Sequence, residues 1–433
     1  MNKDIPYVES LPSHWSVIQN RFLFRYDGKK VGEDFSKYQL LSLTTSGVKE
    51  RDINASGGKV PASYDNYQTV RKGQMVFCLF DLDCSAVFSG ISNYDGMITS
   101  AYDVFSSTGR MDNAFANYWF KFVFSNRYYK MFSKSIRYTI TGDMFRSLKT
   151  PVPPHDEQKK ISAYLFEKEH KIDDLISNVQ AQIDKLKEYK QSIITEVVTK
   201  GLDPTVPMKD SGIRWLGQIP EPWDIVKIIR IADKTHPYAI GDGDHGLIKP
   251  DNYQDQGIPY IRVQNLGWAS ELDTTNIVYI SDETNERIKN STLRPNDVLF
   301  AKTGATIGKT AIVPSSIPIA NTTSHVGKIT VSPKYDPRYI FYVLSSAMGY
   351  RQFWEYASSK TTRPELAIDE IKQVYITLPR SKEEQAEIVA FLDKKCLVAD
   401  ELIQLKQKKV DKLNEYKKSL IYEYVTGKKE VVQ

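Results

Sequence analysis

EQKKISAYLFEKEHKIDDLISNVQAQIDKLKEYKQSIITEVVT, from Glu157 to Thr199, is followed later in the chain by a gap-free second copy, EQAEIVAFLDKKCLVADELIQLKQKKVDKLNEYKKSLIYEYVT, from Glu384 to Thr426. The copies are offset by 227 residues and share about twenty identical positions. A repeat of this length indicates a tandem duplication, which places domain boundaries that hydropathy alone leaves vague. A chain of 433 residues is long enough for two such units, each with its own core.

Both copies are predicted to be single long helices. Neither 156–200 nor 381–426 contains Pro or Gly, and Gly201 and Gly427 follow, as the end of a helix prefers. About 45 residues at 1.5 Å per residue make a rod of roughly 65 Å, which is too long to be buried in one small domain.

An apolar stripe with a seven-residue period runs along each helix. We therefore expect the two helices to pack as an antiparallel coiled coil, which relates the duplicated halves by a pseudo-two-fold axis. The alternative is two ordinary amphipathic helices, each docked on its own domain. The predicted packing positions are Leu165, Ile172, Val179, Leu186 and Ile193 in the first helix and Leu392, Ala399, Ile403, Leu413 and Leu420 in the second, where Lys406 and Lys417 interrupt the stripe.

A second match lies at the start of each unit. YVESLPSHWSVIQNRFLF around Trp15 is similar to WLGQIPEPWDIVKIIRIA around Trp223, whereas the middles share little beyond RKGQMVFC at Arg71 and RPNDVLFA at Arg294. Similar ends with diverged centres indicate two common frameworks that carry two separately specialised surfaces. Neutral drift in loops is the alternative reading.

The middles, 20–150 and 230–376, are predicted to be mixed α/β (α+β) domains. Short runs bounded by turn residues predict strands at YQLLSL from Tyr38, QMVFCLF from Gln74, IPYIRV from Ile258, DVLFA from Asp297 and HVGKITV from His325. Later in each middle we expect an aromatic-rich helix, at NAFANYWFKFVFSN from Asn113 and at DPRYIFYVLSSAMG from Asp336, and then a second helix rich in Tyr, Arg and Lys.

The composition is that of a soluble globular protein, with 41% hydrophobic and 26% charged residues. No apolar run approaches the ~20 residues of a membrane helix, and the first residues lack a signal-peptide pattern, so we expect a cytoplasmic protein without a membrane partner. Cys78, Cys84 and Cys396 are odd in number and lack CxxC spacing, which argues against a disulfide framework or a zinc site. The net charge of +5 permits an anionic partner without requiring one.

The sequence contains no recognisable catalytic or metal-binding motif. GDGDHG at Gly241 fits G-x-G-x-x-G, but acidic side chains fill the loop and no helix pattern follows. TGATIGKT at Thr303 has Thr where a P-loop needs its first Gly, and a glycine-rich hairpin explains it better. The only Pro-Pro pair, in TPVPPHDEQ, lacks the flanking residues expected of an amino-methyltransferase, and the six histidines form no H-E-x-x-H pair.

The combined motifs resemble the DNA specificity subunit of type I restriction-modification enzymes over essentially the whole chain. The residues that carry the resemblance are LPSHW at Leu11, IPEPW at Ile219, VPPHDEQKKI at Val152, LPRSKEEQAEI at Leu378, EVVTKGLD at Glu196 and MKDSGIRWLGQIP at Met208, together with IPYIRVQNLG, DVLFAKTGATIGK and SSKTTRPELAIDEI in the second half.

The resemblance implies a non-catalytic subunit that binds double-stranded DNA, each variable domain reading one half of a bipartite, non-palindromic target. The long helices would set the spacer and hold two methyltransferase subunits. These partners would bring S-adenosylmethionine, and the complex would recruit ATP-driven translocase and nuclease subunits, so that no cofactor is expected in this chain. A coiled-coil scaffold without sequence-specific DNA binding is the alternative.

The resemblance and the repeat together define six segments. They are a first target-recognition domain (1–153), a long helix (154–201), a linker (202–218), a second target-recognition domain (219–379), a second long helix (380–427) and a tail (428–433).

Basic and hydroxyl side chains near glycine or turn residues are the candidates for DNA contact. Those expected to contact phosphates are Lys134, Arg137, Tyr138 and Thr141 in the first half and Lys360, Thr361, Thr362 and Arg363 in the second. Those expected to contact base edges are Thr44, Thr45, Ser46 and Lys49 in one loop and Lys302, Thr303, Thr306 and Lys309 in another. Solvent-exposed turns are the alternative for each residue.

Overall fold

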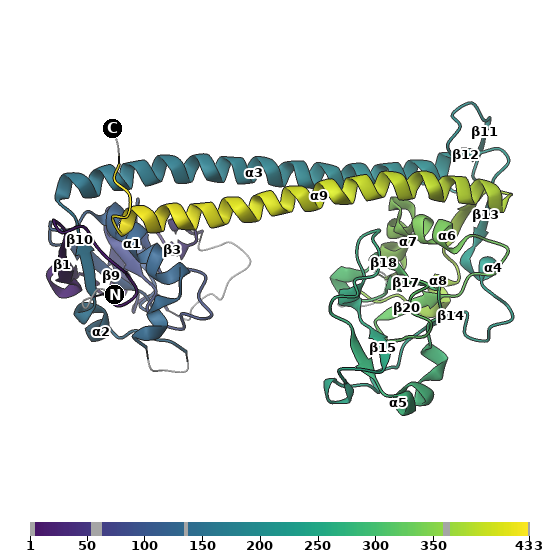
Figure 1. Ribbon diagram of the computed structural model, residues 1–433, viewed down its shortest axis with the longest axis horizontal. Helices are drawn as coiled ribbons and strands as arrows, with labels where there is room; N and C mark the ends of the chain where they lie inside the picture. The colour runs from purple at the N-terminus through teal and green to yellow at the C-terminus, as the bar shows by residue number, and fades with distance from the viewer. Residues whose placement is uncertain (1–4, 53–62, 134–136, 358–363, 432–433) are drawn as a thin grey trace. The chain divides into compact units, whose positions relative to one another are not determined.

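The computed structural model describes residues 5–52, 63–133, 137–357 and 364–431, which form two compact units. Unit 1 comprises 1–180 and 408–433, and unit 2 comprises 181–407. The division falls inside two long helices, α3 (His155–Lys200) and α9 (Lys382–Val425), so that each unit contains a segment of both (Figure 1).

Unit 1 is built around a four-stranded antiparallel sheet in the order β2-β9-β6-β7. Three antiparallel pairs, β1-β10, β3-β4 and β5-β8, complete its strands. The elements are β1 (Ser16–Gln19), β2 (Phe24–Tyr26), β3 (Leu41–Thr44), β4 (Gly47–Glu50), β5 (Gln68–Val70), β6 (Met75–Phe77), β7 (Ser89–Ile91), β8 (Gly96–Ile98), β9 (Asp103–Ser107), α1 (Asn113–Ser125), α2 (Gly142–Ser147) and β10 (Lys149–Val152).

Unit 2 repeats the plan with a four-stranded antiparallel sheet in the order β14-β20-β17-β18 and a pair β13-β21 that corresponds to β1-β10. It adds a β16-β15-β19 sheet and a β11-β12 pair. The elements are β11 (Met208–Asp210), β12 (Gln218–Pro220), β13 (Asp224–Lys227), α4 (Ile228–Ile231), β14 (Ile240–Asp242), β15 (Ile258–Ile261), β16 (Val278–Ile280), α5 (Asp282–Arg287), β17 (Val298–Ala301), β18 (Thr310–Ile312), β19 (Asn321–Thr322), β20 (Val326–Ile329), α6 (Pro337–Ser345), α7 (Ala347–Ala357), α8 (Ile368–Ile371) and β21 (Tyr375–Leu378).

The long helices contribute to the core of each unit. In unit 1, Leu165 of α3 and Tyr424 of α9 belong to the cluster formed by α1 and the central sheet. In unit 2, Val197 of α3 and Leu392 of α9 join the cluster around α6. Burial of these apolar faces, rather than helix propensity, therefore holds the helix segments in place.

The two helix segments run antiparallel within each unit. In unit 1, Asp173 of α3 pairs with Lys417 of α9 at 2.8 Å, and the ring of Tyr164 lies 4.7 Å from that of Tyr424, between centroids. In unit 2, Lys190 pairs with Asp400 at 2.7 Å, and Gln182 accepts a hydrogen bond from Lys406. Residue numbers rise along one helix as they fall along the other, which confirms the predicted fold class of mixed α/β domains with two antiparallel helices.

The predicted packing positions differ in burial. Leu165, Ile172, Val179, Leu392, Ala399 and Leu420 are buried, whereas Leu186, Ile193, Ile403 and Leu413 are half-buried.

The five predicted strand regions coincide with β3, β6, β15, β17 and β20, and the aromatic-rich helices are α1 and α6. The predicted glycine-rich hairpin is the antiparallel pair β17-β18. A second helix follows α6 as α7. In the first half the expected second helix is wrong for the described part of the Tyr-, Arg- and Lys-rich segment, because Tyr128–Met131 forms a 3-10 turn and the next helix is the short α2. Arg127 precedes this turn with a left-handed φ of 57°, which ends the helical path.

Candidate nucleic-acid interface

One buried tryptophan in each unit contacts the start of one long helix and the end of the other. Trp15 donates from Nε1 to Oε1 of Glu157 at 3.0 Å, and a Cβ at Gly427 would lie 3.1 Å from the same ring. Trp223 donates to Glu384 at 2.7 Å, and a Cβ at Gly201 would lie 3.3 Å from its ring. We call these contacts the tryptophan anchors. Both are built from residues that the repeat shares.

A repeated glutamine joins the long helix to the aromatic-rich helix of its unit. Oε1 of Gln158 accepts from the backbone N of Asp112 at 2.6 Å, and Oε1 of Gln385 accepts from that of Asp336 at 2.9 Å. Asp112 and Asp336 are the N-caps of α1 and α6. The repeated framework therefore sets the position of both aromatic-rich helices.

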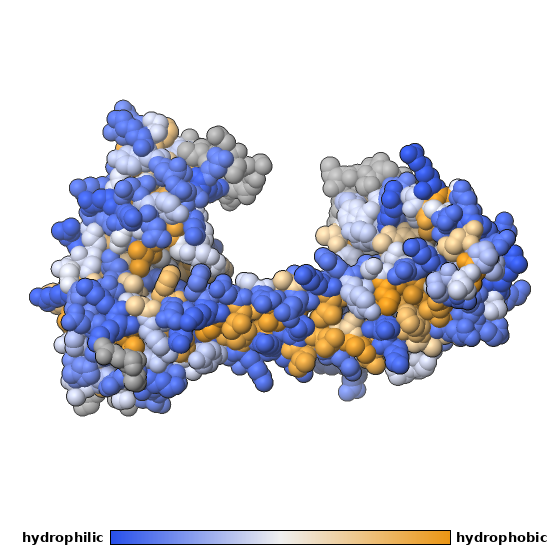
Figure 2. Space-filling view, turned by 90° about the horizontal axis from the view of Figure 1, so that it is seen from above, coloured by the Kyte–Doolittle hydropathy of each residue, from blue (hydrophilic) through white to orange (hydrophobic). Residues whose placement is uncertain are grey.

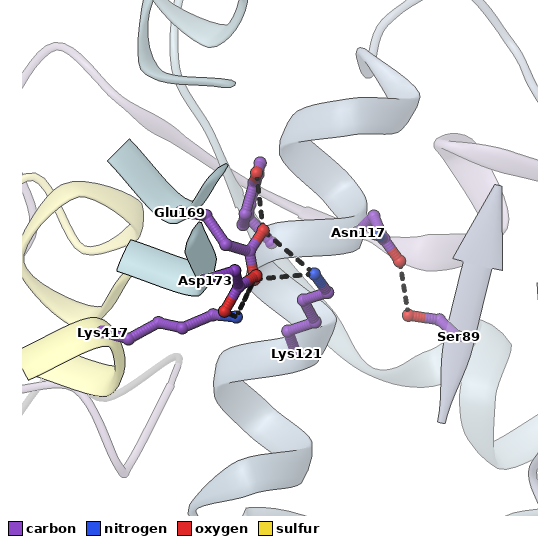
Figure 3. Close-up of polar contacts among 7 residues, drawn as sticks. Ser89, Asn117, Lys121, Glu169, Asp173 and Lys417 are labelled. Carbon is purple, nitrogen blue, oxygen red and sulfur yellow. Dashed lines mark hydrogen bonds and ion pairs between the residues drawn. The ribbon is translucent and has the colours of Figure 1, made fainter. Parts of the chain in front are cut away.

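A charged cluster links α1 to both long helices within unit 1. Glu169 of α3 accepts from Nζ of Lys121 at 3.1 Å and from the hydroxyl of Tyr118 at 3.0 Å, both on α1. Nζ of Lys417 on α9 lies 3.1 Å from Glu169 and 2.8 Å from Asp173. Figure 3 shows the four charged side chains pointing toward one another from three helices.

The cluster stays charged because attraction outweighs burial. Burial alone would raise the pKa of Glu169, but the ammonium groups of Lys121 and Lys417 hold it below its ordinary value. Burial would likewise lower the pKa of Lys417, and Asp173 together with Glu169 raises it instead. The cluster is thus a set of ion pairs at neutral pH.

Unit 2 has a counterpart of this cluster. Arg338 of α6 lies 2.6 Å from Asp393 of α9 and 2.6 Å from Glu271, and the hydroxyl of Tyr342 donates to Asp393 at 2.6 Å. In both units, a cation and a tyrosine of the aromatic-rich helix bind an acid of a long helix. The arrangement orients each globular part against its helices.

The predicted base-contact loop of the first half is the tip of the β3-β4 hairpin. Thr45 and Ser46 are exposed and help to line a polar cavity of about 410 Å³ between α1 and α3. Ser89 and Asn117, hydrogen-bonded to each other, and the charged cluster line the same cavity (Figure 3). Thr44 is engaged within the hairpin, because its hydroxyl donates to the carbonyl of Gly47, whereas Lys49 is exposed.

The loop after the central strand contacts the segment before the framework in both units. Leu366 donates from its backbone N to the carbonyl of Lys302 at 2.8 Å, and Ile140 donates to the carbonyl of Leu79 at 2.7 Å. Leu79 and Lys302 follow the equivalent strands β6 and β17. We call this place the strand-end site and define it as residues 79–85 and 137–141 in unit 1 and residues 302–309 and 364–366 in unit 2.

In unit 2, the strand-end site is a network of charged and hydroxyl groups. Nζ of Lys302 lies 2.8 Å from Asp242 and 3.2 Å from Glu365, and the lysine side chain is only 8% exposed. Oγ1 of Thr303 lies 3.2 Å from Nδ1 of His325. Residues 302–304 are therefore adjacent to residues 364–366.

In unit 1, the acids at the same place form two ion pairs with nearby basic side chains. Arg137 lies 3.4 Å from Asp81, and 78% of its side chain is exposed. Asp83 accepts from the hydroxyl of Tyr129 at 3.0 Å and pairs with Lys130 at 3.0 Å. The hydrogen bond from Lys130 is the main reason that the pKa of Asp83 lies below its ordinary value.

Several other predicted contact residues have structural partners. Thr141 is the N-cap of α2, Tyr138 lies under the Nζ of Lys130 at 4.4 Å, and Thr306 donates to the carbonyl of Thr303. Lys309 is half-buried. The remaining candidates, Lys134, Lys360, Thr361, Thr362 and Arg363, lie outside the described residues.

Sequence reasoning did not assign a contact role to Asp81, or to Asp242 and His325, which contact the strand-end site of unit 2. The match between RKGQMVFC and RPNDVLFA, offset by 223 residues, places Asp81 level with Gly304 and is the signal that marks the two loops as equivalent. Asp242 and His325 give no such signal, because they reach the site from β14 and from the turn before β20.

Exposed apolar side chains gather along the long helices (Figure 2). The large ones on the unit 2 segment of α9 are Leu397, Val398, Leu402 and Leu405. Apolar side chains of this size are uncommon on a free helix face, so the patch is suited to contact with another protein.

Among the described residues, no group of three or more His, Cys, Asp and Glu side chains is arranged to hold a metal ion. Within the same residues, no helix combines the length and apolar character needed to cross a membrane.

Residues 220–415 match the family described as the type I restriction modification DNA specificity domain. The chain is 26% identical over 293 residues to the type I restriction enzyme MjaVIII specificity subunit of Methanocaldococcus jannaschii, covering 66% of this chain and 63% of that protein. It is 28% identical over 285 residues to the type I restriction enzyme EcoBI specificity subunit of Escherichia coli, covering 64% and 57%. The chain thus spans somewhat less than two thirds of these relatives.

A solved chain from work on the complex assembly and conformational transition of the type I R-M system shares the fold. Its TM-score is 0.67 at 16% sequence identity, and the match covers 96% of this chain and 99% of that one. The resemblance to type I DNA specificity subunits is therefore confirmed.

Proposed function

We propose that this chain is the DNA specificity subunit of a type I restriction-modification complex and that each unit reads one half of a bipartite, non-palindromic target. The main support for this proposal is the match of residues 220–415 to the DNA specificity domain, in a chain whose two halves repeat one framework. Equivalent strand-end sites with different side chains support two different half-sites.

The proposed role is recognition without catalysis. Two methyltransferase subunits would bind the repeated framework and supply S-adenosylmethionine, and translocase and nuclease subunits would use ATP. The exposed apolar side chains of α9 support a protein-binding surface on the helices. The complex would act in the cytoplasm on double-stranded DNA.

The test is a comparison of methylomes. Modified bases are read genome-wide in a host carrying this gene with its methyltransferase gene, and again after deletion of this gene alone. We expect methylation to disappear at one split motif and to return when the gene is restored on a plasmid. Retention of every methylated motif after deletion would refute the specificity role and favour a scaffold.

A binding assay provides an independent check. The purified complex with its methyltransferase subunits should bind duplexes that carry the motif more tightly than duplexes with one half-site scrambled, and its affinity should fall with rising salt. Equal affinity for both duplexes would contradict sequence-specific recognition.

A further inference from the structure

The strand-end sites share backbone geometry but not chemistry. Asp81 and Gly304 occupy equivalent positions and both have left-handed backbones, with φ of 48° and 60°. Each lies two residues after the residue, Leu79 or Lys302, whose carbonyl accepts from Ile140 or Leu366. A duplicated backbone that carries different side chains is what two readers of different sequences require.

The carboxylate of Asp81 can accept further hydrogen bonds, whereas that of its neighbour Asp83 is already occupied. The carboxylate of Asp83 is held by Tyr129 and Lys130. That of Asp81 makes one long contact, 3.4 Å to Arg137, among the side chains that the structure describes. An exposed ion pair at this distance contributes little to stability, so its two groups can separate at small cost when another partner arrives.

The backbone at this place is held in an unusual conformation. Asp81 and Tyr138, both in the strand-end site of unit 1, each have a φ of 48°, and His245, beside Asp242 in unit 2, has a φ of 50°. Non-glycine residues in this region are strained, and such strain concentrates at functional sites. The backbone N–H groups of Cys84 and Ser85 donate to the carbonyl of Asp81 and hold this turn in place.

We propose that Asp81 and Arg137 together read one G·C base pair in the half-site bound by unit 1. A guanidinium donates to O6 and N7 of guanine, and a carboxylate accepts from the N4 amino group of cytosine. Two opposite charges that lie side by side match the two bases of a single pair. This inference rests on the proposed function and names specificity-determining residues within it.

Phosphate contact is the less suitable role for this site. Within residues 79–85 and 137–141 the charged side chains are Asp81, Asp83 and Arg137, so the site itself carries no net positive charge to attract a phosphate. Matched donors and acceptors suit base edges instead.

The test uses the full complex in its host. Asp81→Ala and Arg137→Ala are expressed separately, and the methylated motif of each is determined. We expect each variant to lower the preference for G·C at one position of one half-site by about tenfold or more, with the other half-site unchanged. The double variant should lose little more, because both residues read the same pair. Glu167→Gln, which breaks an exposed ion pair with Lys171 on α3 of the same unit, should leave the motif unchanged.

The outcomes separate this inference from the proposed function. A uniform loss of methylation with the sequence preference intact, or a relaxed A·T position, would overturn the assignment of Asp81 and Arg137 while leaving the specificity role standing. Absence of any split motif with the unaltered chain would overturn both. If Asp81→Ala fails to assemble, Arg137→Ala decides alone, because its exposed side chain is not needed for folding.

Discussion

Nε1 of Trp223 lies 2.7 Å from Oε1 of Glu384, although 161 residues separate them in the chain. Trp223 is 1% exposed, so its indole N–H has no access to solvent. The bond fixes the start of α9 to the strand pair of unit 2, as Trp15 fixes the start of α3 in unit 1.

Removing this bond should weaken unit 2. Trp223→Phe and Glu384→Ala should each lower the free energy of unfolding by about 1–3 kcal/mol, because a buried hydrogen bond to a charged group is lost. The double variant should cost less than the sum, measured by urea unfolding. Trp268→Phe, at a ring that is 52% exposed, is the control and should change stability by less than about 0.5 kcal/mol. Full additivity would argue against a direct coupling.

Alanine substitutions at the two glycines of the tryptophan anchors should destabilise the protein by different amounts. Gly427→Ala should be more destabilising than Gly201→Ala, because its Cβ would lie 2.4 Å from Cγ of Pro12, whereas that of Gly201 would lie 3.3 Å from Trp223. Gly109→Ala has a similar positive φ and no atom within 4 Å, so it reports backbone strain alone, about 1–2 kcal/mol. Thermal melts of the three variants test the order. Equal shifts would show that contact with the anchors adds nothing.

Glu169 should make stability depend on acid pH. Its pKa is lowered in the folded state, so its contribution is present above the unfolded pKa near 4.5 and is lost as the pH falls through the folded pKa. Glu169→Gln should therefore destabilise the protein at pH 7, by about 1–3 kcal/mol, and the difference from the unaltered chain should shrink below pH 4. Glu167→Gln is the matched control in an exposed pair. A difference that is constant with pH would contradict an ionic role.

Removing only the acid of the pair Lys190–Asp400 should cost more stability than replacing both residues. The Lys190 side chain is 7% exposed and that of Asp400 is 39% exposed, so Asp400→Ala leaves a buried ammonium without its partner. We expect that variant to lose about 2 kcal/mol or more, and Lys190→Met with Asp400→Leu to lose less, because no charge then remains buried. Urea unfolding of both variants measures the difference, and a larger loss in the double variant would contradict this account.

If the long helices set the spacer of the target, lengthening both should lengthen it. Seven residues inserted after Gln180 in α3 and after Gln407 in α9 preserve the apolar stripe and add about 10 Å, the length of about three base pairs. The methylome should show the same two half-sites with a spacer longer by about that amount. An unchanged spacer in a methylating variant would contradict the role of the helices.

The long helices could be predicted because a seven-residue apolar period is a local signal that survives without tertiary context. Their antiparallel direction could be predicted because it relates the duplicated halves by a pseudo-two-fold axis. The partners of Lys417 could not, because they depend on which residues of the other helix lie level with it. In sequence, Lys417 only interrupts a stripe.

The strand-end site could be predicted in part. Lys302 and Thr303 are prominent beside glycines in sequence, but the burial of the Lys302 ammonium depends on Asp242 and Glu365, which arrive from distant segments. Asp81 looks like an ordinary turn residue until Arg137 is placed beside it. Local patterns thus locate the loop, while charge pairing between loops requires the fold.

Unit 1 consists of two separate stretches of the chain, and this affects the order in which the protein can fold during its synthesis. Leu420, Ile421 and Val425 lie in the core of unit 1, yet the ribosome synthesises all of 181–407 before it reaches them. Unit 2 can therefore complete its core during translation, whereas the earlier part of unit 1 must wait with an apolar face uncovered. Chaperone binding to nascent chains should persist longest on this half of the protein.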